Sequence, residues 1–141
     1  MPQNISHTPS NENRNVIQRL YDAFARGDGT AALAEMHETL HWNEADNFMY
    51  SDRNPYTSPQ AVAEGVFGRL VTDWENYEAT ATEILESGDT VVALGRSKGI
   101  HRGTRKVMDA QFAHVWRLKD GKIVGFQQYI DTLGVHQATV S

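Results

Sequence analysis

The residues that could carry chemistry gather near the end of the chain. The stretch FAHVWRLKDGKIVGFQQYID, from Phe112 to Asp131, sets a histidine, two glutamines and an aspartate among apolar side chains. A carboxylate can act as a general acid or base, and an apolar environment raises its pKa towards neutral. A histidine or an amide can donate a hydrogen bond to an oxygen on which negative charge develops. These residues are therefore candidates for acid/base chemistry.

Two strands must position these side chains. The dipeptide Asp120-Gly121 predicts a two-residue hairpin turn, which pairs Leu118 with Ile123 and, farther out, His114 with Gln127. Side chains alternate along a strand, so one face would mix polar groups with aromatic rings, as small-molecule pockets do. The residues expected on that face are Phe112, His114, Trp116, Gln127, Tyr129 and Asp131. The opposite face is also largely apolar and could meet a second subunit.

A second hairpin adds an arginine. If its loop is 102–104, Arg96 lies beside Ala110 on the pocket face and can reach Asp131. A loop one residue longer or shorter could move Arg96 to the other side of the sheet. A purely structural role stays open for every candidate. Asp131 can cap the turn that follows it, and His114 can be a core histidine with a hydrogen-bonded ring nitrogen. Arg96 can form a surface ion pair, and Glu44 can be the solvated end of a strand.

The rest of the chain supplies helices first and strands later. Apolar spacing predicts a helix over 13–26, a short helix capped by Thr30, and a third helix starting at Ser58-Pro59. A strand at TLHWNEA (39–45) precedes the third helix, and long strands follow from Asp73. Helices followed by a strand meander predict an α+β fold in which three N-terminal helices cover one curved antiparallel sheet and leave a pocket between the layers.

Composition limits the possible partners. The chain has 141 residues, a net charge of −5 and no cysteine, and it has no basic cluster and no apolar run long enough for a membrane span. We therefore expect one domain over 13–135, a flexible tail over 1–12 and a C-terminal tail over 136–141. We expect a cytoplasmic protein that binds neither nucleic acid nor membranes. No phosphate loop, nucleophile elbow or zinc spacing is present, so no cofactor or metal is predicted.

Several segments resemble one family in order along about residues 13–133. VIQRLYDAFARGDGTAALAEMHETLHWNE, the helix after SP, SGDTVVALGR and HVWRLKDGKIVGFQQYIDT are similar to the SnoaL-like, ketosteroid-isomerase-related branch of the nuclear-transport-factor-2-like (NTF2-like) superfamily. The resemblance implies a strongly curved, cone-shaped α+β barrel that encloses a deep pocket, and a homodimer.

The resemblance also implies roles for particular residues. Asp131 looks like the acid/base aspartate of the polyketide cyclases, and His114 is similar in place to a cyclase histidine. Glu44 falls where ketosteroid isomerases carry their base, but their tyrosine falls near Leu20, with Tyr21 out of step by one. Arg96 and Asp131 also resemble two members of the trio of limonene-epoxide-hydrolase-like enzymes, whose third position is here Lys98.

We therefore expect a cofactor-free acid/base enzyme of the isomerase or cyclase type that acts on a small hydrophobic carbonyl compound. The catalytic candidates are Asp131, His114, Arg96 and Glu44. The candidates for substrate binding are Trp42, Phe112, Trp116, Gln127 and Tyr129. The alternatives are a non-catalytic small-molecule-binding protein, an epoxide-hydrolase-like enzyme and a dimeric scaffold.

Overall fold

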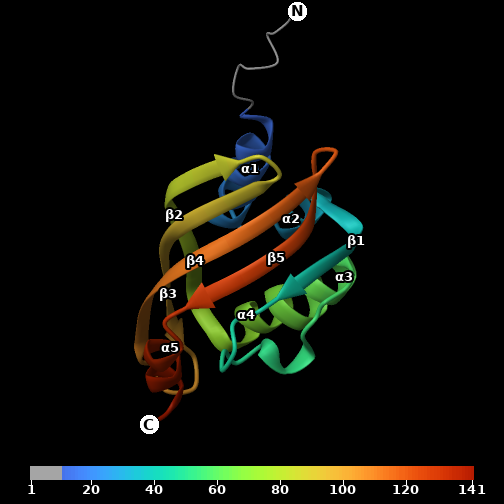
Figure 1. The fold of residues 1–141 in the computed structure, drawn as a ribbon. Helices are drawn as coiled ribbons and strands as arrows, with labels where there is room; N and C mark the ends of the chain where they lie inside the picture. The colour runs from blue at the N-terminus through green and yellow to red at the C-terminus, as the bar shows by residue number, and fades with distance from the viewer. Residues whose placement is uncertain (1–10) are drawn as a thin grey trace, which may run out of the picture.

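A computed structural model describes residues 11–141 of the chain. The helices precede the long strands, one strand lies between the second and third helices, and a short helix ends the chain (Figure 1). The elements are α1 (Glu12–Ala25), α2 (Gly29–Ala34), β1 (Met36–Asn43), the 3₁₀ turn η2 (Ser51–Arg53), α3 (Pro59–Val62), the π-helical segment η3 (Ala63–Phe67), α4 (Gly68–Asp73), β2 (Trp74–Ser87), β3 (Thr90–His101), β4 (Val107–Lys119), β5 (Lys122–Ile130) and α5 (Thr132–Thr139).

The first two helices follow from the apolar spacing and from one capping carboxylate. On α1, Val16, Ile17 and Leu20 recur at helical spacing and are buried in the core. The chain leaves this helix at Gly27 with φ +71°, a conformation that glycine adopts without strain. The carboxylate of Asp28 then accepts the backbone N–H of Ala31 and begins α2. The predicted cap, Thr30, lies inside this helix instead.

The third predicted helix is a continuous run of α3, η3 and α4. The Ser58 hydroxyl accepts the Ala61 N–H and Pro59 occupies the first turn, as the sequence indicates. In the middle of the run, Gly65 makes room for a ring, because a Cβ there would lie 2.3 Å from Cε2 of Tyr56. This close approach ties the helical run to the loop that follows β1.

The five strands form one curved, open sheet in the order β1-β5-β4-β3-β2. All neighbouring pairs are antiparallel except β1 and β5, which are parallel. Figure 1 shows α1, α2 and the α3–α4 run behind one face of this sheet, while α5 lies at the end near the C-terminus. The predicted α+β class is confirmed, with a sheet that is mostly antiparallel and does not close into a barrel.

The register differs from the predicted one in both hairpins. Leu118 pairs with Ile123 as predicted, but an irregularity follows, so His114 pairs with Gln128 and not with Gln127. The other hairpin has one more loop residue than predicted, because Arg105 extends the turn at φ +62°, and Arg96 is therefore paired with Gln111. A shift of one residue moves a side chain to the other face of a sheet. Both errors therefore change which residues face the helices.

The elements at the two ends of the chain differ from the predicted tails. Residues 1–10 of the predicted tail over 1–12 lie outside the described residues, and α1 begins at Glu12. The predicted tail over 136–141 is mostly helix, because α5 continues to Thr139 and buries Val135 and Ala138. Within residues 11–141, no helix has the length and hydropathy needed to cross a membrane.

Candidate functional site

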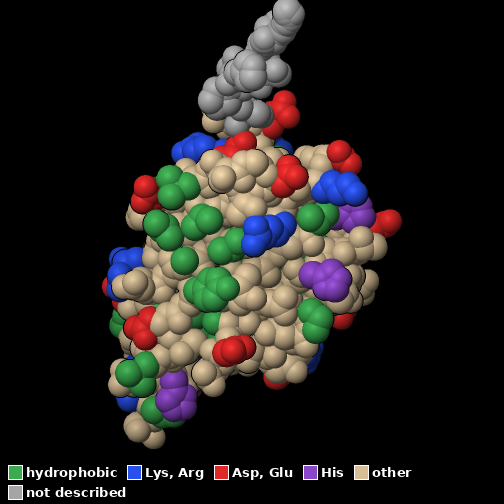
Figure 2. All heavy atoms as spheres, in the orientation of Figure 1, with side chains coloured by type: hydrophobic (Ala, Val, Ile, Leu, Met, Phe, Trp, Pro, Cys, Tyr) green, Lys and Arg blue, Asp and Glu red, His purple; other side chains and the backbone are tan. Residues whose placement is uncertain are grey.

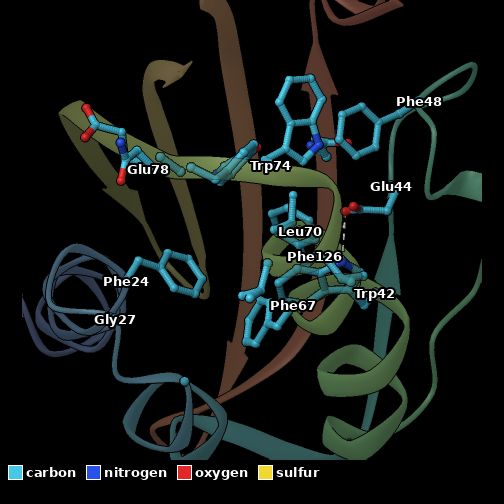
Figure 3. Close-up of a pocket in the computed structure, with 18 of the residues that line it drawn as sticks. Phe24, Gly27, Trp42, Glu44, Phe48, Phe67, Leu70, Trp74, Glu78 and Phe126 are labelled. Atoms are coloured by element: carbon cyan, nitrogen blue, oxygen red, sulfur yellow. Dashed lines mark hydrogen bonds between the residues drawn. The ribbon is translucent and has the colours of Figure 1, made fainter. Parts of the chain in front are cut away.

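A cavity of about 380 Å³ lies between the helices and the inner face of the sheet. Aromatic rings make up much of its wall, and Figure 3 shows those of Phe24, Phe67 and Trp42 around it, with the Glu44 carboxylate beside the last. The lining residues are Phe24, Gly27, Asp28, Gly29, Trp42, Glu44, Phe48, Val66, Phe67, Leu70, Val71, Trp74, Asn76, Tyr77, Glu78, Ala79, Arg102, His114, Trp116, Phe126 and Gln128. Its volume lies in the range of small-molecule sites.

Glu44 is the buried carboxylate of this cavity. It follows β1 directly and is only 3% exposed. Trp42 Nε1 donates a hydrogen bond to its Oε2 at 3.0 Å. Burial raises the pKa of Glu44 to about 8, although the Trp42 hydrogen bond and the positive charge of Arg69 act in the opposite direction. A carboxyl with such a pKa can take up and release a proton near neutral pH.

The backbone around Glu44 is held by a side chain from the following loop. The Asn54 Oδ1 accepts the Glu44 N–H at 2.9 Å, and the Asn54 Nδ2 donates to the Glu44 carbonyl oxygen at 2.8 Å. Trp42 and Tyr56 also exchange two backbone hydrogen bonds across the base of this loop. These contacts fix the position from which the carboxylate enters the cavity.

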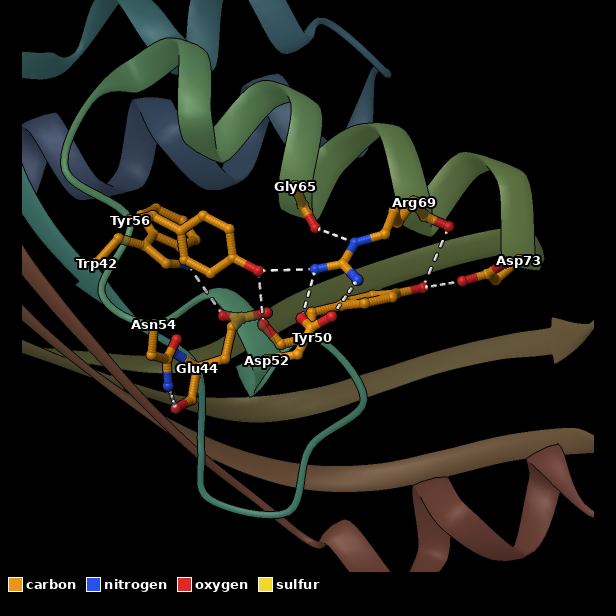
Figure 4. Close-up of polar contacts among 9 residues, drawn as sticks. All are labelled: Trp42, Glu44, Tyr50, Asp52, Asn54, Tyr56, Gly65, Arg69 and Asp73. Atoms are coloured by element: carbon orange, nitrogen blue, oxygen red, sulfur yellow. Dashed lines mark hydrogen bonds and ion pairs between the residues drawn. The ribbon is translucent and has the colours of Figure 1, made fainter.

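A polar network behind the carboxylate connects that loop to α4 (Figure 4). The Arg69 guanidinium forms a bidentate ion pair with Asp52 at 2.8 and 3.0 Å and also donates to the Tyr56 hydroxyl at 2.8 Å. It lies over the ring of Tyr50, whose hydroxyl donates to Asp73 at 2.8 Å. Arg69 therefore holds the loop and places a positive charge where it acts on Glu44.

Gln128 supplies a second polar group to the cavity. It is buried, and its Oε1 accepts the backbone N–H of Ala45 at 3.0 Å. Because Ala45 follows Glu44 in the chain, this bond sets the amide close to the carboxylate. The predicted register put Gln128 on the opposite face, and the shift of one residue in β5 brings it in.

His114 is the third polar group. It is 5% exposed, and its ring stacks on Phe112 with centroids 3.8 Å apart. Its Nδ1 lies 2.5 Å from the hydroxyl oxygen of Tyr21 on α1. Burial lowers the pKa of His114 to about 3, so the imidazole is neutral over the physiological range.

Each of these three residues keeps one polar atom for a ligand. Within residues 11–141, only Trp74 Nε1 and Ser97 Oγ are both closed off from solvent and without a hydrogen-bond partner. The Oε1 of Glu44, the Nε2 of Gln128 and the Nε2 of His114 have no hydrogen-bond partner in this part of the chain. They must therefore be accessible, and the cavity that these residues line is the space they face. One carboxylate oxygen and two side-chain nitrogens thus face the same cavity.

Two of the predicted catalytic residues lie elsewhere. The Asp131 carboxylate caps α5 by accepting the Gly134 N–H at 3.0 Å, the structural role that the sequence left open. Arg96 pairs with Asp109 at 2.7 Å on the outer face, where both side chains are 48% exposed. Neither lines the cavity, and they do not form the predicted pair.

The predicted binding residues divide in the same way. Trp42 and Trp116 line the cavity, whereas Phe112 is buried behind His114 and does not line it. Gln127 and Tyr129 face outward with the opposite set of β5 side chains, and Tyr129 is 57% exposed. The irregularity in β5 explains why Gln127 and Tyr129 face outward.

No group of three or more His, Asp or Glu side chains within 11–141 is placed to hold a metal ion. The buried polar side chains that line the cavity are instead one carboxyl, one amide and one imidazole, those of Glu44, Gln128 and His114. Such a set can exchange a proton with a bound molecule and donate hydrogen bonds to its oxygen.

This fold is found in a known family. The chain belongs to the SnoaL-like family of the NTF2-like superfamily, whose domain model matches residues 17–126. No curated protein matches the chain.

Solved structures have the same fold. An NTF2-like protein from Burkholderia thailandensis is 34% identical, with a TM-score of 0.87 over 92% of this chain and 98% of that one. An NTF2-like protein of unknown function from Burkholderia pseudomallei is 23% identical, with a TM-score of 0.84 over 92% and 98% of the two chains. TerC, crystallised with polyporic acid, is 22% identical, with a TM-score of 0.82 over 92% and 99%.

Proposed function

We propose that the protein is a cofactor-free acid/base enzyme of the isomerase or cyclase type that acts on a small hydrophobic carbonyl compound. The observation that carries this proposal is the Glu44 carboxyl, buried in an apolar cavity with a pKa of about 8. At pH 7 roughly a tenth of such a group is ionised, and the rest is protonated. Glu44 can therefore serve as base in one step and as acid in the next.

The step can be followed atom by atom. The Glu44 carboxylate removes a proton from the carbon next to the carbonyl. The electron pair of that C–H bond forms a C=C bond, and the π electron pair of the carbonyl moves onto its oxygen. Nitrogen donors of Gln128 and His114 stabilise the resulting enolate oxygen. The protonated Glu44 then returns its proton to a carbon of the enolate. In a cyclase, the enolate carbon instead attacks a second carbonyl and closes a ring, the π electron pair of that carbonyl moves onto its oxygen, and this oxygen takes the proton from Glu44.

The walls of the cavity support a flat, apolar substrate. Rings of Trp42, Phe67, Trp116 and Phe126 surround the polar atoms, and about 380 Å³ accommodates two or three fused rings. TerC, a protein of the same fold, was crystallised with polyporic acid. We therefore place flat ring ketones first among the candidates.

Deuterium exchange tests the proposal without knowledge of the natural substrate. Flat bicyclic ketones such as β-tetralone would be incubated with the protein in D₂O, and loss of the proton next to the carbonyl would be followed by NMR. We expect exchange above the protein-free rate, and a decrease of about 100-fold or more in Glu44→Gln. Asp131→Asn is the matched control, because it changes a carboxylate outside the cavity and keeps a capping side chain. Equal rates in all three proteins would contradict the role of Glu44.

A non-catalytic binding protein is the second candidate, supported by the cavity itself. Its distinguishing result is a ketone that raises the melting temperature while its deuterium exchange stays at the background rate. The cavity does not favour the scaffold alternative, because a protein that serves only as a scaffold does not need an open space between its helices and its sheet. The epoxide-hydrolase alternative loses its support because Arg96 and Asp131 do not line the cavity.

We also propose that the outer face of the sheet is the interface of a homodimer. Figure 2 shows several hydrophobic side chains on that face, together with a Lys or Arg side chain and a His side chain near its middle. Tyr129 and Val115 border a hollow there. Sedimentation of the wild type and of Tyr129→Lys tests this, and a mutant that sediments as the wild type does would contradict it.

A further inference from the structure

A chain of three buried side chains leads from β4 through α1 to the cavity. Trp116 Nε1 donates a hydrogen bond to the Tyr21 hydroxyl oxygen at 3.1 Å. The same oxygen lies 2.5 Å from His114 Nδ1. Tyr21 and Trp116 are buried, and their rings meet edge to face. Tyr21 contributes to the site although the family pattern, as read from the sequence, placed it one residue out of step.

The chemistry of the three groups fixes the direction of the hydrogen bonds. An indole nitrogen can only donate, so the Tyr21 oxygen accepts from Trp116. The Tyr21 O–H must then find an acceptor, and the one within reach among residues 11–141 is His114 Nδ1. A nitrogen that accepts carries no proton, so the proton of the neutral ring is on Nε2.

The opposite arrangement leaves a buried group unsatisfied. If His114 carried its proton on Nδ1, the Tyr21 oxygen would accept two bonds and its own proton would have no partner in the described part of the chain. An unsatisfied buried donor destabilises a fold by roughly 1–3 kcal/mol. Burial also raises the pKa of Tyr21 and lowers that of His114, so both groups stay neutral.

We infer that Tyr21 and Trp116 are positioning residues that hold His114 as a neutral imidazole with its proton on Nε2, so that this N–H points at the oxygen of a bound ligand. His114 then polarises a carbonyl by donating a hydrogen bond and does not transfer a proton. The identity of that oxygen rests on the proposed function. The tautomer is a property of the ligand-free protein and does not depend on it.

These hydrogen bonds also explain why a histidine is placed among aromatic rings. A protonated imidazole in contact with Phe112, Phe126 and Trp116 would be poorly solvated. A neutral imidazole has one donor and one acceptor, and here the acceptor is satisfied by Tyr21. The remaining N–H is then ready in its final orientation before a ligand arrives, which avoids reorganisation during the reaction.

Long-range ¹H–¹⁵N spectra of the histidine rings test the inference in the ligand-free protein at pH 7.5. The His114 signals would be assigned by their loss in His114→Gln. We expect Nδ1 of the wild type at the shift of an unprotonated nitrogen and Nε2 at that of a protonated one. In Tyr21→Phe we expect the two shifts to move towards each other, as the tautomers mix. Tyr129→Phe, on the outer face, is the matched control and should leave them unchanged.

Two results would overturn the inference. One is a wild-type His114 that carries its proton on Nδ1 or on both nitrogens, and this needs no variant at all. The other is a folded Tyr21→Phe whose His114 shifts equal those of the wild type. Trp116→Phe serves as a second variant if Tyr21→Phe does not fold. These readouts do not use turnover, so a negative deuterium-exchange result would contradict the proposed function and leave the tautomer assignment as it is.

Discussion

Replacing Glu44 by glutamine should change how the stability of the protein depends on pH. The carboxyl has a pKa of about 8 in the folded protein, against an ordinary value of 4.5. Between these two values the folded state binds the proton and the unfolded state has lost it. Stability therefore decreases as pH rises through this window, because unfolding lets the carboxyl ionise in water.

The magnitude follows from the size of the window. Each pH unit of difference is worth about 1.4 kcal/mol, so the window from 4.5 to about 8 amounts to roughly 5 kcal/mol. Because Glu44 is almost fully buried, screening by solvent reduces this contribution little. Glutamine keeps the shape and cannot ionise, so Glu44→Gln should lack this contribution.

Urea unfolding of both proteins from pH 5 to pH 9 measures the effect. Relative to Glu44→Gln, the wild type should lose stability steadily as pH rises to about 8 and then level off, because above the folded-state pKa both states have lost the proton. All other ionisable groups are common to the two proteins and cancel in the difference. A difference that stays constant over this range would refute a raised pKa for Glu44.

Three further predictions follow from the same contacts. His114→Gln should resist acid better than the wild type. The folded-state pKa of His114 is lowered to about 3 from 6.5, so the wild type loses stability as pH falls below 6.5. Urea unfolding at pH 7 and pH 4 measures this, and an equal loss of stability in both proteins contradicts it. Gly65→Ala should destabilise the fold by about 1–3 kcal/mol, because its Cβ would overlap Tyr56; an unchanged urea midpoint contradicts the close packing. Trp42→Phe removes the hydrogen bond that favours ionised Glu44, so the pKa of Glu44 should rise by roughly one unit in a ¹³C NMR titration, and a fall would contradict the assignment.

Much of the fold could be predicted from local patterns. Helical spacing predicted α1, the serine-proline pair predicted the start of α3, and the long strands expected after Asp73 are β2 to β5. These features depend on a few neighbouring residues. The pairing of β1 with β5 depends on contacts between distant segments, and no local pattern shows it.

The site could be predicted only in part, because its polar residues depend on register. Glu44 and His114 were found, but the irregularity before Gly125 turns Gln127 outward and Gln128 inward. A glycine inside a strand is a known sign of a bulge, and Gly125 was the signal that could have corrected the prediction. Tyr21 lies on the buried face of α1, but its contact with His114 depends on how the helix packs on the sheet.

The central claim is that Glu44 is a cavity carboxyl that exchanges its proton near neutral pH. A ¹³C NMR titration of glutamate side-chain carboxyls, with the Glu44 signal assigned by its loss in Glu44→Gln, measures this directly. We predict a midpoint near pH 8 for that one signal. A midpoint near the ordinary value of 4.5 would show that Glu44 is always ionised at neutral pH, and would contradict its role as the acid and base of this site.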